Sequence, residues 1–116
     1  MVKRTEFIES SAFRRLELRH LRYFVVAAQE CHFGHAGRRL NVSTSAVSRQ
    51  IQDLEEILGV QLFDRLSRGV VLSRSGHLFF EETKRILDDI DETSRRFMDG
   101  GQGEIASLKI GINDSA

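Results

Sequence analysis

A run of short polar side chains with one arginine is the part of this sequence best suited to binding chemistry. Residues 42–55 read VSTSAVSRQIQDLE, in which apolar residues recur at helical spacing behind Ser43, a good N-cap residue. Short hydroxyl side chains let a helix backbone approach the major groove of DNA closely, and arginine reaches base edges or phosphates. The candidate DNA-contacting residues of this helix are Ser43, Thr44, Ser45, Ser48, Arg49 and Gln52.

Three residues stand out as individual candidates. Arg49 is the best single candidate for base reading, because a guanidinium can bond guanine O6 and N7 together. Arg68, beside a glycine in a predicted turn, suits a minor-groove or phosphate contact, and His35 suits a phosphate contact. The alternative is an ordinary solvated helix face with a serine cap, and an inert turn. The pattern shows no metal-ligand spacing, phosphate-binding glycine loop or catalytic triad, so we expect no metal, no cofactor and no enzyme activity.

Three helices are predicted to position these residues. Apolar spacing indicates a first helix over about 18–30, a short second helix over 32–40 and a third helix from Ser43 to about Leu58. Asn41 and Val42 form a predicted tight turn, and Gly59 stands where a glycine commonly ends a helix.

The pattern then changes to short β-prone runs. Residues 62–63 and 70–72 are predicted to pair as a hairpin or wing across the loop 64–69. Ser73 is expected to cap a long helix over 74–98, followed by a glycine-rich break and one strand near 108–112. A lone strand is not stable, so we expect it to begin a second domain that this sequence lacks.

These elements predict a mainly α fold, a winged helix-turn-helix followed by a long helix. We divide the chain into an N-terminal extension (1–15), a winged helix-turn-helix domain (16–76), a linker or dimerisation helix (77–99) and a hinge with the first strand of the missing domain (100–116). The extension is expected to be a loose arm or a weak helix.

The long helix carries a heptad-like apolar seam. Its members are Phe79, Thr83, Ile86, Ile90, Thr93 and Phe97, with Phe80 and Leu87 widening it. A helix of about 24 residues is about 36 Å long, more than so small a domain can cover. We therefore expect a homodimer; the alternative is that the seam packs on its own winged domain, beginning near Leu78.

Charge is unevenly distributed along a chain of zero formal net charge. Residues 17–76 hold eight Arg against six Asp or Glu, whereas residues 77–116 hold five Lys or Arg against nine Asp or Glu. A basic front permits a DNA-facing surface. The single cysteine, Cys31, fits a reducing compartment, and no run reaches the roughly 18 apolar residues of a membrane span. With no secretion signal at the start, we expect a cytoplasmic protein.

The order and spacing of these residues resemble the N-terminal DNA-binding part of LysR-type transcriptional regulators, over residues 16 to about 98. The matching segments are 18–24 (LRHLRYF), Phe33, Ala36, Leu40, 42–43 (VS), 46–51 (AVSRQI), 54–55 (LE), 58–65 (LGVQLFDR) and 72–76 (LSRSG). The resemblance implies binding of imperfect palindromes in promoter DNA, as a dimer or, in the complete protein, a tetramer. It also implies a small-molecule effector that acts only through the missing domain. It carries a DNA-contacting role to Thr44, Ser45, Ser48 and Arg49, and to the wing.

The sequence departs from the family pattern in two places. His32, Gly34 and Gly37 stand where the family often has Ser, Thr and Ala, so the second helix lacks its usual hydroxyl cap, and we expect His32 to be a substitute cap or a surface residue. Thr44-Ser45 replaces a common Gln-Pro, so the base preference of relatives does not carry over. Two other functions compete with the LysR reading: a complete small winged-helix repressor, and a winged helix used only for protein–protein assembly.

Overall fold

The computed structural model describes residues 10–98, and the chain divides into two compact units, Met1–Thr83 and Lys84–Ala116. The described elements are α2 (Ser11–Arg15), α3 (Leu18–Glu30), α4 (Phe33–Leu40), α5 (Thr44–Leu58), β1 (Phe63–Arg65), β2 (Val70–Leu72) and α6 (Arg74–Met98). The predicted glycine-rich break and the strand near 108–112 lie outside the described residues. No described helix is long and apolar enough to cross a membrane.

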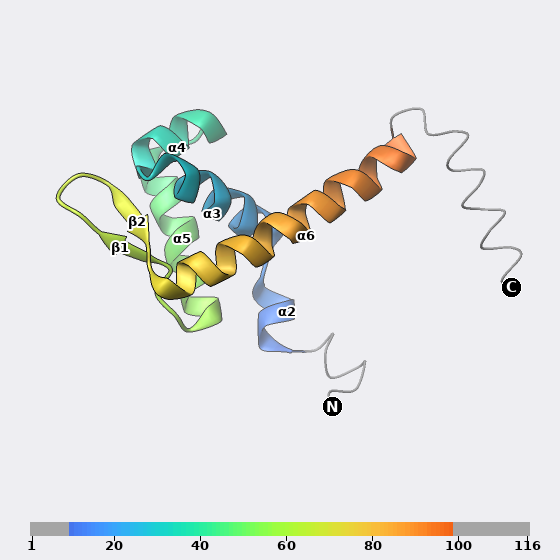
Figure 1. The fold of residues 1–116 in the computed structure, drawn as a ribbon, viewed down its shortest axis with the longest axis horizontal. Coiled ribbons are helices and arrows are strands. Elements are labelled where there is room, and N and C mark those ends of the chain that lie inside the picture. Colours follow the sequence, from blue (N-terminus) through green and yellow to red (C-terminus); the bar gives the residue numbers. More distant parts are fainter. Residues whose placement is uncertain (1–9, 99–116) are drawn as a thin grey trace, which may run out of the picture. The chain divides into compact units, whose positions relative to one another are not determined.

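Helices α3, α4 and α5 pack against one another and enclose the core of the first unit (Figure 1). Each contributes one buried stripe, as helical periodicity predicts. The most deeply buried apolar residues are Phe24, Ala27, Ala36, Val47, Ile51, Leu54 and Leu62. Full burial of a Val, Leu, Ile or Phe side chain stabilises a fold by about 1.5–3 kcal/mol, so this stripe-on-stripe packing fixes the direction of α5.

The predicted helix ends are confirmed by their caps. The Ser43 hydroxyl accepts the backbone N–H of Ala46 (3.1 Å), and the Ser73 hydroxyl accepts that of Gly76 (3.0 Å). Helix α5 ends at Gly59, whose left-handed backbone (φ 71°) donates its N–H to the Glu55 carbonyl. Such caps satisfy backbone groups that a helix terminus leaves unpaired. The recognition-helix candidate therefore begins and ends where its sequence indicates.

The loop of the hairpin is shorter than predicted. Strands β1 and β2 are antiparallel, with Phe63 opposite Leu72 and Arg65 opposite Val70. Asp64 and Arg65 thus belong to the strand, and the prediction of a loop over 64–69 was wrong at its start. The turn closes where the N–H of Leu66 donates to the carbonyl of Gly69 (3.0 Å). The reason is that hydrogen-bonded pairing between β1 and β2 outweighs the weak strand propensity of Asp.

Glu55 links α5 to the hairpin, although its sequence context predicts a solvated helix face. Its carboxylate accepts the backbone N–H groups of Leu62 (2.7 Å) and Phe63 (3.3 Å). Leu62 stands just before β1, and Phe63 is its first residue, so neither N–H can bond within a helix. Buried backbone N–H groups need an acceptor, and the Glu55 carboxylate supplies one to both. One side chain therefore holds the start of the hairpin against α5.

Glu55→Ala is expected to lower the free energy of unfolding by about 2 kcal/mol, because two backbone donors beside the buried Leu62 lose a charged acceptor. In a domain of this size the midpoint of thermal unfolding should fall by about 10 °C, measured by circular dichroism. The neighbouring Glu56→Ala is the matched control, since Glu56 pairs with Arg15 at the surface, 3.4 Å away. Equal midpoints for the two variants would contradict the role of Glu55.

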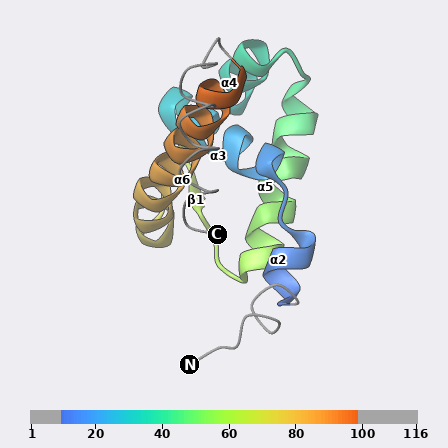
Figure 2. The same ribbon diagram turned by 90° about the vertical axis from the view of Figure 1, so that its right-hand side faces the viewer.

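Helix α2 begins the described part of the chain. It lies beside the C-terminal end of α5 (Figure 2), where Arg15 pairs with Glu56. Within the predicted N-terminal extension, residues 11–15 are helical, and residues 1–9 lie outside the described residues.

The beginning of α6 packs on its own domain, and this alters the predicted dimer seam. The rings of Phe79 and Phe80 lie 5.2 Å and 6.3 Å from the ring of Phe24, and Thr83 is completely buried. Thr83 was wrongly assigned to the dimer seam, because a side chain with no exposed surface cannot meet a partner. Leu78 does not pack on its domain as the alternative expected: 69% of it is exposed. Apolar spacing alone cannot say which neighbour covers a helix face.

Candidate nucleic-acid interface

The predicted DNA-contacting face of α5 is available on the surface. Ser43, Thr44, Ser45, Arg49 and Gln52 are exposed, and Ser48 is half-buried. The opposite face is buried in the core, so the helix cannot rotate these side chains inward. The Ser43 hydroxyl is also engaged locally, as the cap acceptor and within 3.3 Å of the Ser45 hydroxyl. The remaining polar groups of the face are free to meet a ligand in a fixed array.

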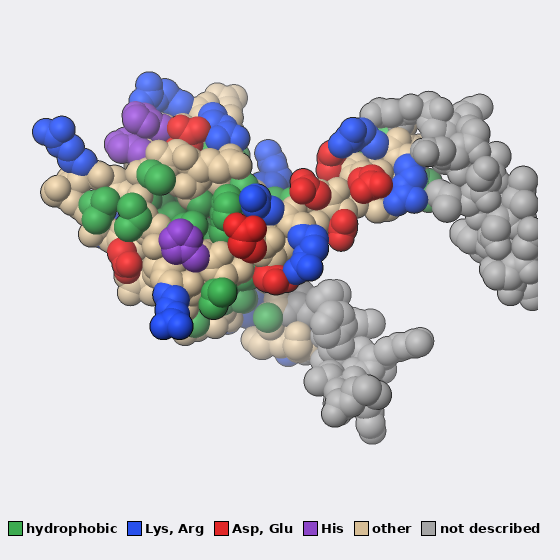
Figure 3. All heavy atoms as spheres, viewed as in Figure 1, with side chains coloured by type: hydrophobic (Ala, Val, Ile, Leu, Met, Phe, Trp, Pro, Cys, Tyr) green, Lys and Arg blue, Asp and Glu red, His purple; other side chains and the backbone are tan. Residues whose placement is uncertain are grey.

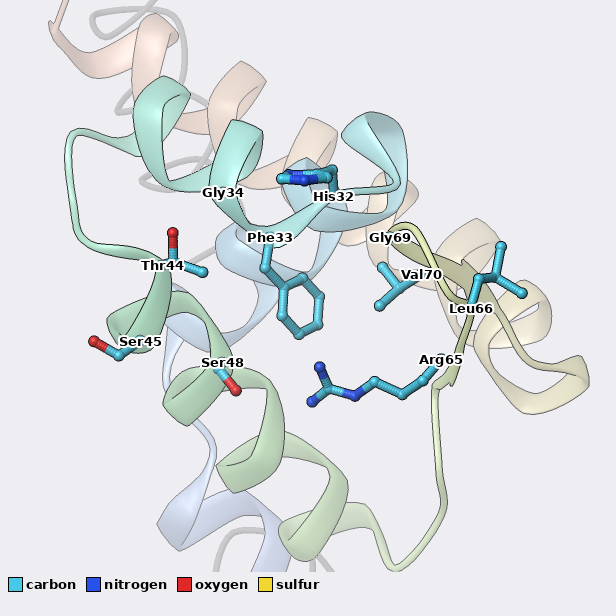
Figure 4. A pocket seen from close by; sticks show the side chains of 10 residues that line it. All are labelled: His32, Phe33, Gly34, Thr44, Ser45, Ser48, Arg65, Leu66, Gly69 and Val70. Carbon is cyan, nitrogen blue, oxygen red and sulfur yellow. The ribbon is translucent and has the colours of Figure 1, made fainter.

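A groove with a volume of about 670 Å³ lies between α4, α5 and the hairpin. Figure 4 shows the side chains around it. Its lining residues are His32, Phe33, Gly34, Thr44, Ser45, Ser48, Arg65, Leu66, Gly69 and Val70. The structure therefore brings Thr44, Ser45 and Ser48 together with the turn end of the hairpin, formed by Arg65, Leu66, Gly69 and Val70. Arg49 and Gln52 do not line this groove.

The hairpin is fastened to the junction between α3 and α4. The carbonyl of Cys31 accepts the N–H of Val70 (3.0 Å). Gly69 has φ +88°, and a Cβ built there would lie 2.4 Å from the same carbonyl oxygen. Only glycine fits this approach. The exposed Arg68 therefore lies in a turn that is fixed, through Gly69 and Val70, beside the start of α4.

His32 caps α4, so the expectation of a substitute cap is confirmed. Its Nδ1 accepts the N–H of His35 (3.1 Å), and the two rings stack with centroids 4.0 Å apart. In neutral His32 the proton then lies on Nε2. A Cβ at Gly34 would come within 2.8 Å of His32 Cε1, so the imidazole fills the space that a side chain at 34 would need. The departures from the family pattern at His32 and Gly34 are thus linked, because the His32 ring occupies the space beside Gly34. His35 is exposed and remains a candidate phosphate contact.

Arg65 also lines the groove; the sequence places it, with Arg38 and Arg74, among arginines that could touch phosphate or simply be solvated. Its guanidinium carbon lies 5.2 Å from the centre of the Phe33 ring. In the sequence it is one of several arginines that a carboxylate or water could satisfy, and no local pattern brings residues 33 and 65 together. On the face seen in Figure 3, Lys, Arg and His side chains gather over α4, a basic side chain projects at the tip of the hairpin, and both acidic and basic side chains lie along α6. Among the described residues no cluster of three or more His, Cys, Asp or Glu could hold a metal.

Comparison with known families gives a match over residues 18–77, to a family described as "Bacterial regulatory helix-turn-helix protein, lysR family". The chain belongs to the lysR family. The match runs from the start of α3 into α6 and includes both walls of the groove. The resemblance inferred from the sequence motifs is confirmed, and so is the winged helix-turn-helix fold.

Curated lysR-family relatives are transcriptional regulators. The chain is 45% identical over 87% of its length to the uncharacterized HTH-type transcriptional regulator YnfL of Escherichia coli (strain K12), covering 34% of that protein. It is 41% identical over 88% of its length to the regulator XapR of the same organism, covering 35% of it. The chain thus spans about a third of the length of these relatives.

Solved structures of the family include complexes with DNA. The DNA-binding domain of BenM in the catB site 1 DNA complex matches with a TM-score of 0.71 and 39% identity, covering 75% of this chain and 98% of that one. The DNA-binding domain of CbnR in its DNA complex matches with a TM-score of 0.69 and 37% identity, covering 75% of this chain and all (100%) of that one. The described fold is therefore that of lysR-family DNA-binding domains.

Proposed function

We propose that this chain binds promoter DNA sequence-specifically and regulates transcription, with α5 in the major groove and the hairpin as the wing. The observation that carries the proposal is the groove in which Thr44, Ser45 and Ser48 of α5 face the fixed turn end of the hairpin. The BenM and CbnR domains, which match this fold, were solved in complex with DNA, and this supports the same partner here. Family relatives named as transcriptional regulators support the regulatory role.

In this mechanism different groups on the exposed face of α5 contact bases and phosphates. Thr44, Ser48 and Arg49 read base edges, while the capped N-terminus of α5 holds backbone N–H groups near phosphate. Arg68 in the turn of the wing contacts phosphate or the minor groove and fixes the register of α5. Fixed packing of α5 and the wing on one core presents these groups without reorganisation, which lowers the entropic cost of binding.

The salt dependence of duplex binding tests this function. The chain should bind a mixed-sequence fluorescent duplex, with log K falling linearly in log salt by about 0.9 for every phosphate neutralised. Fluorescence anisotropy between 50 and 200 mM salt measures this slope. A chain that serves only protein–protein assembly would show no binding, or binding without a salt slope, and either result would contradict the proposal.

We propose further that the chain acts as a homodimer through the described C-terminal part of α6. Within residues 84–98, Ile86, Ile90 and Phe97 are exposed, and Leu87 is half-buried. Their spacing, with Thr93, follows the steps of four and three that place residues on one helix face. The described residues 84–98 form no hydrophobic core of their own. Burial of their apolar stripe against a second copy of the chain is therefore favoured. Two recognition helices held by such a dimer would read a palindrome.

Ile90→Glu is expected to convert the dimer to a monomer, because it places a charge in the centre of the apolar stripe. Light scattering at tens of micromolar should give twice the chain mass of 13.2 kDa for the unaltered protein and about one chain mass for the variant. Asp88→Asn, about 200° away around the helix, is the control and should stay dimeric. A monomeric mass for the unaltered protein would rule out this interface.

A further inference from the structure

Arg65 places an oriented cation inside the groove. Its guanidinium lies against Phe33, which is 7% exposed and held edge-on by Phe63 (centroids 5.5 Å apart, planes at 90°). Figure 4 shows the Arg65 side chain running from the hairpin beneath the Phe33 ring toward Ser48. In the part of the chain that the structure describes, no carboxylate pairs with Arg65, whereas Arg39 pairs with Glu30. The side chain is thus positioned by an aromatic ring and not by a counter-charge.

A cation–π contact leaves the binding capacity of a guanidinium intact. The guanidinium carbon of Arg65 lies over the Phe33 ring, and the five N–H donors of the group lie in the guanidinium plane. These donors match two oxygens of a phosphate in a bidentate, charge-assisted pair. Holding the side chain in place before binding reduces the conformational entropy lost when a partner arrives. A flexible, fully solvated arginine lacks this advantage.

The place of the groove decides which part of DNA Arg65 meets. One wall is the N-terminal half of α5, the other is the turn end of the hairpin. With α5 in the major groove and the wing against the adjacent backbone or minor groove, the sugar–phosphate strand that separates the two DNA grooves passes between these walls. Arg65 enters this space from the hairpin and not from α5, so its donors meet phosphate oxygens.

We propose that Arg65, held in place by Phe33, is a phosphate-contacting residue of the DNA interface that positions the duplex without reading its sequence. This inference rests on the proposed DNA binding and adds a residue and a role to it. Arg49 and Arg65 then have separate tasks: the first discriminates bases, and the second contributes equally to every sequence.

The experiment compares Arg65→Gln with Arg22→Gln, which removes an equally exposed arginine from α3, outside the groove. Binding of two duplexes, one selected from a random pool and one scrambled, is measured across a salt series. Arg65→Gln should weaken both by about tenfold and reduce the salt slope by about 0.9, leaving base preference unchanged. Arg22→Gln should match the unaltered chain. Arg65→Lys should recover part of the affinity, because lysine keeps the charge but not the planar fork.

A second comparison tests the part played by Phe33. Phe33→Leu should weaken binding in the unaltered chain and have no further effect in the Arg65→Gln background, with thermal midpoints recorded to confirm folding. Unchanged affinity and slope in Arg65→Gln would overturn the inference, and so would a changed base preference with an unchanged slope. If the unaltered chain binds neither duplex, the proposed function fails, and this inference fails with it.

Discussion

Gly76→Ala is expected to lower the free energy of unfolding by about 3 kcal/mol. A Cβ at Gly76 would lie 2.0 Å from the carbonyl oxygen of Leu62, a contact with backbone that no rotamer change can relieve. The same carbonyl accepts the N–H of Ser73 (2.9 Å), so it cannot move without breaking the cap region of α6. The substitution must therefore separate α6 from the start of β1.

Thermal unfolding followed by circular dichroism measures this effect. A loss of about 3 kcal/mol corresponds to a fall of roughly 12 °C or more in the midpoint for a domain of this size. Ser75→Ala, one residue earlier in the same helix, is the control, because its side chain makes no such backbone approach and the midpoint should move by a degree or two. A midpoint for Gly76→Ala within that same small range would show that the packing of α6 on β1 is not tight.

Arg49→Ala is expected to weaken binding of the preferred duplex by about 1–3 kcal/mol, or roughly 10- to 100-fold, because a bidentate contact with one base pair is lost. Arg49 is exposed on the face of α5 opposite the core, so its removal leaves the fold unchanged. Binding of non-preferred duplexes should fall much less. The ratio of the two affinities therefore separates loss of base reading from loss of charge.

Competition between the preferred duplex and single-base variants locates the contact. The unaltered chain should discriminate at one base pair in each half-site where Arg49→Ala does not. Arg22→Ala removes the same charge from α3 and should retain the full discrimination. If Arg49→Ala keeps both its affinity and its base preference, Arg49 takes no part in the readout.

The features that the sequence predicted correctly are set by neighbours along the chain. Ser43, Ser73 and Gly59 mark helix ends because each satisfies backbone groups within three or four residues. Periodic apolar residues likewise predict three helices and their buried faces. Local chemistry therefore sufficed for the recognition helix and for its exposed polar side chains.

The features that the sequence did not reveal depend on contacts across the fold. Glu55 reaches the start of β1 only because α5 packs beside the hairpin, and Arg65 meets Phe33 only because the wing is fastened beside α4. Thr83 is the converse case, in which the sequence pattern predicts a contact that the fold prevents. It keeps the heptad spacing of the seam, yet the first unit of its own chain buries it, and periodicity does not identify the partner that covers a helix face.

Selection of bound fragments from a random duplex pool is the most direct test of the central claim that this chain reads DNA sequence through α5. At moderate salt, the account predicts enrichment of one motif made of two related half-sites, with centres separated by whole turns of about 34 Å. Enrichment of such a motif would establish sequence reading and give the spacing set by the dimer. A pool that stays random after repeated rounds, with binding that is weak and only salt-dependent, would contradict sequence-specific recognition by this chain.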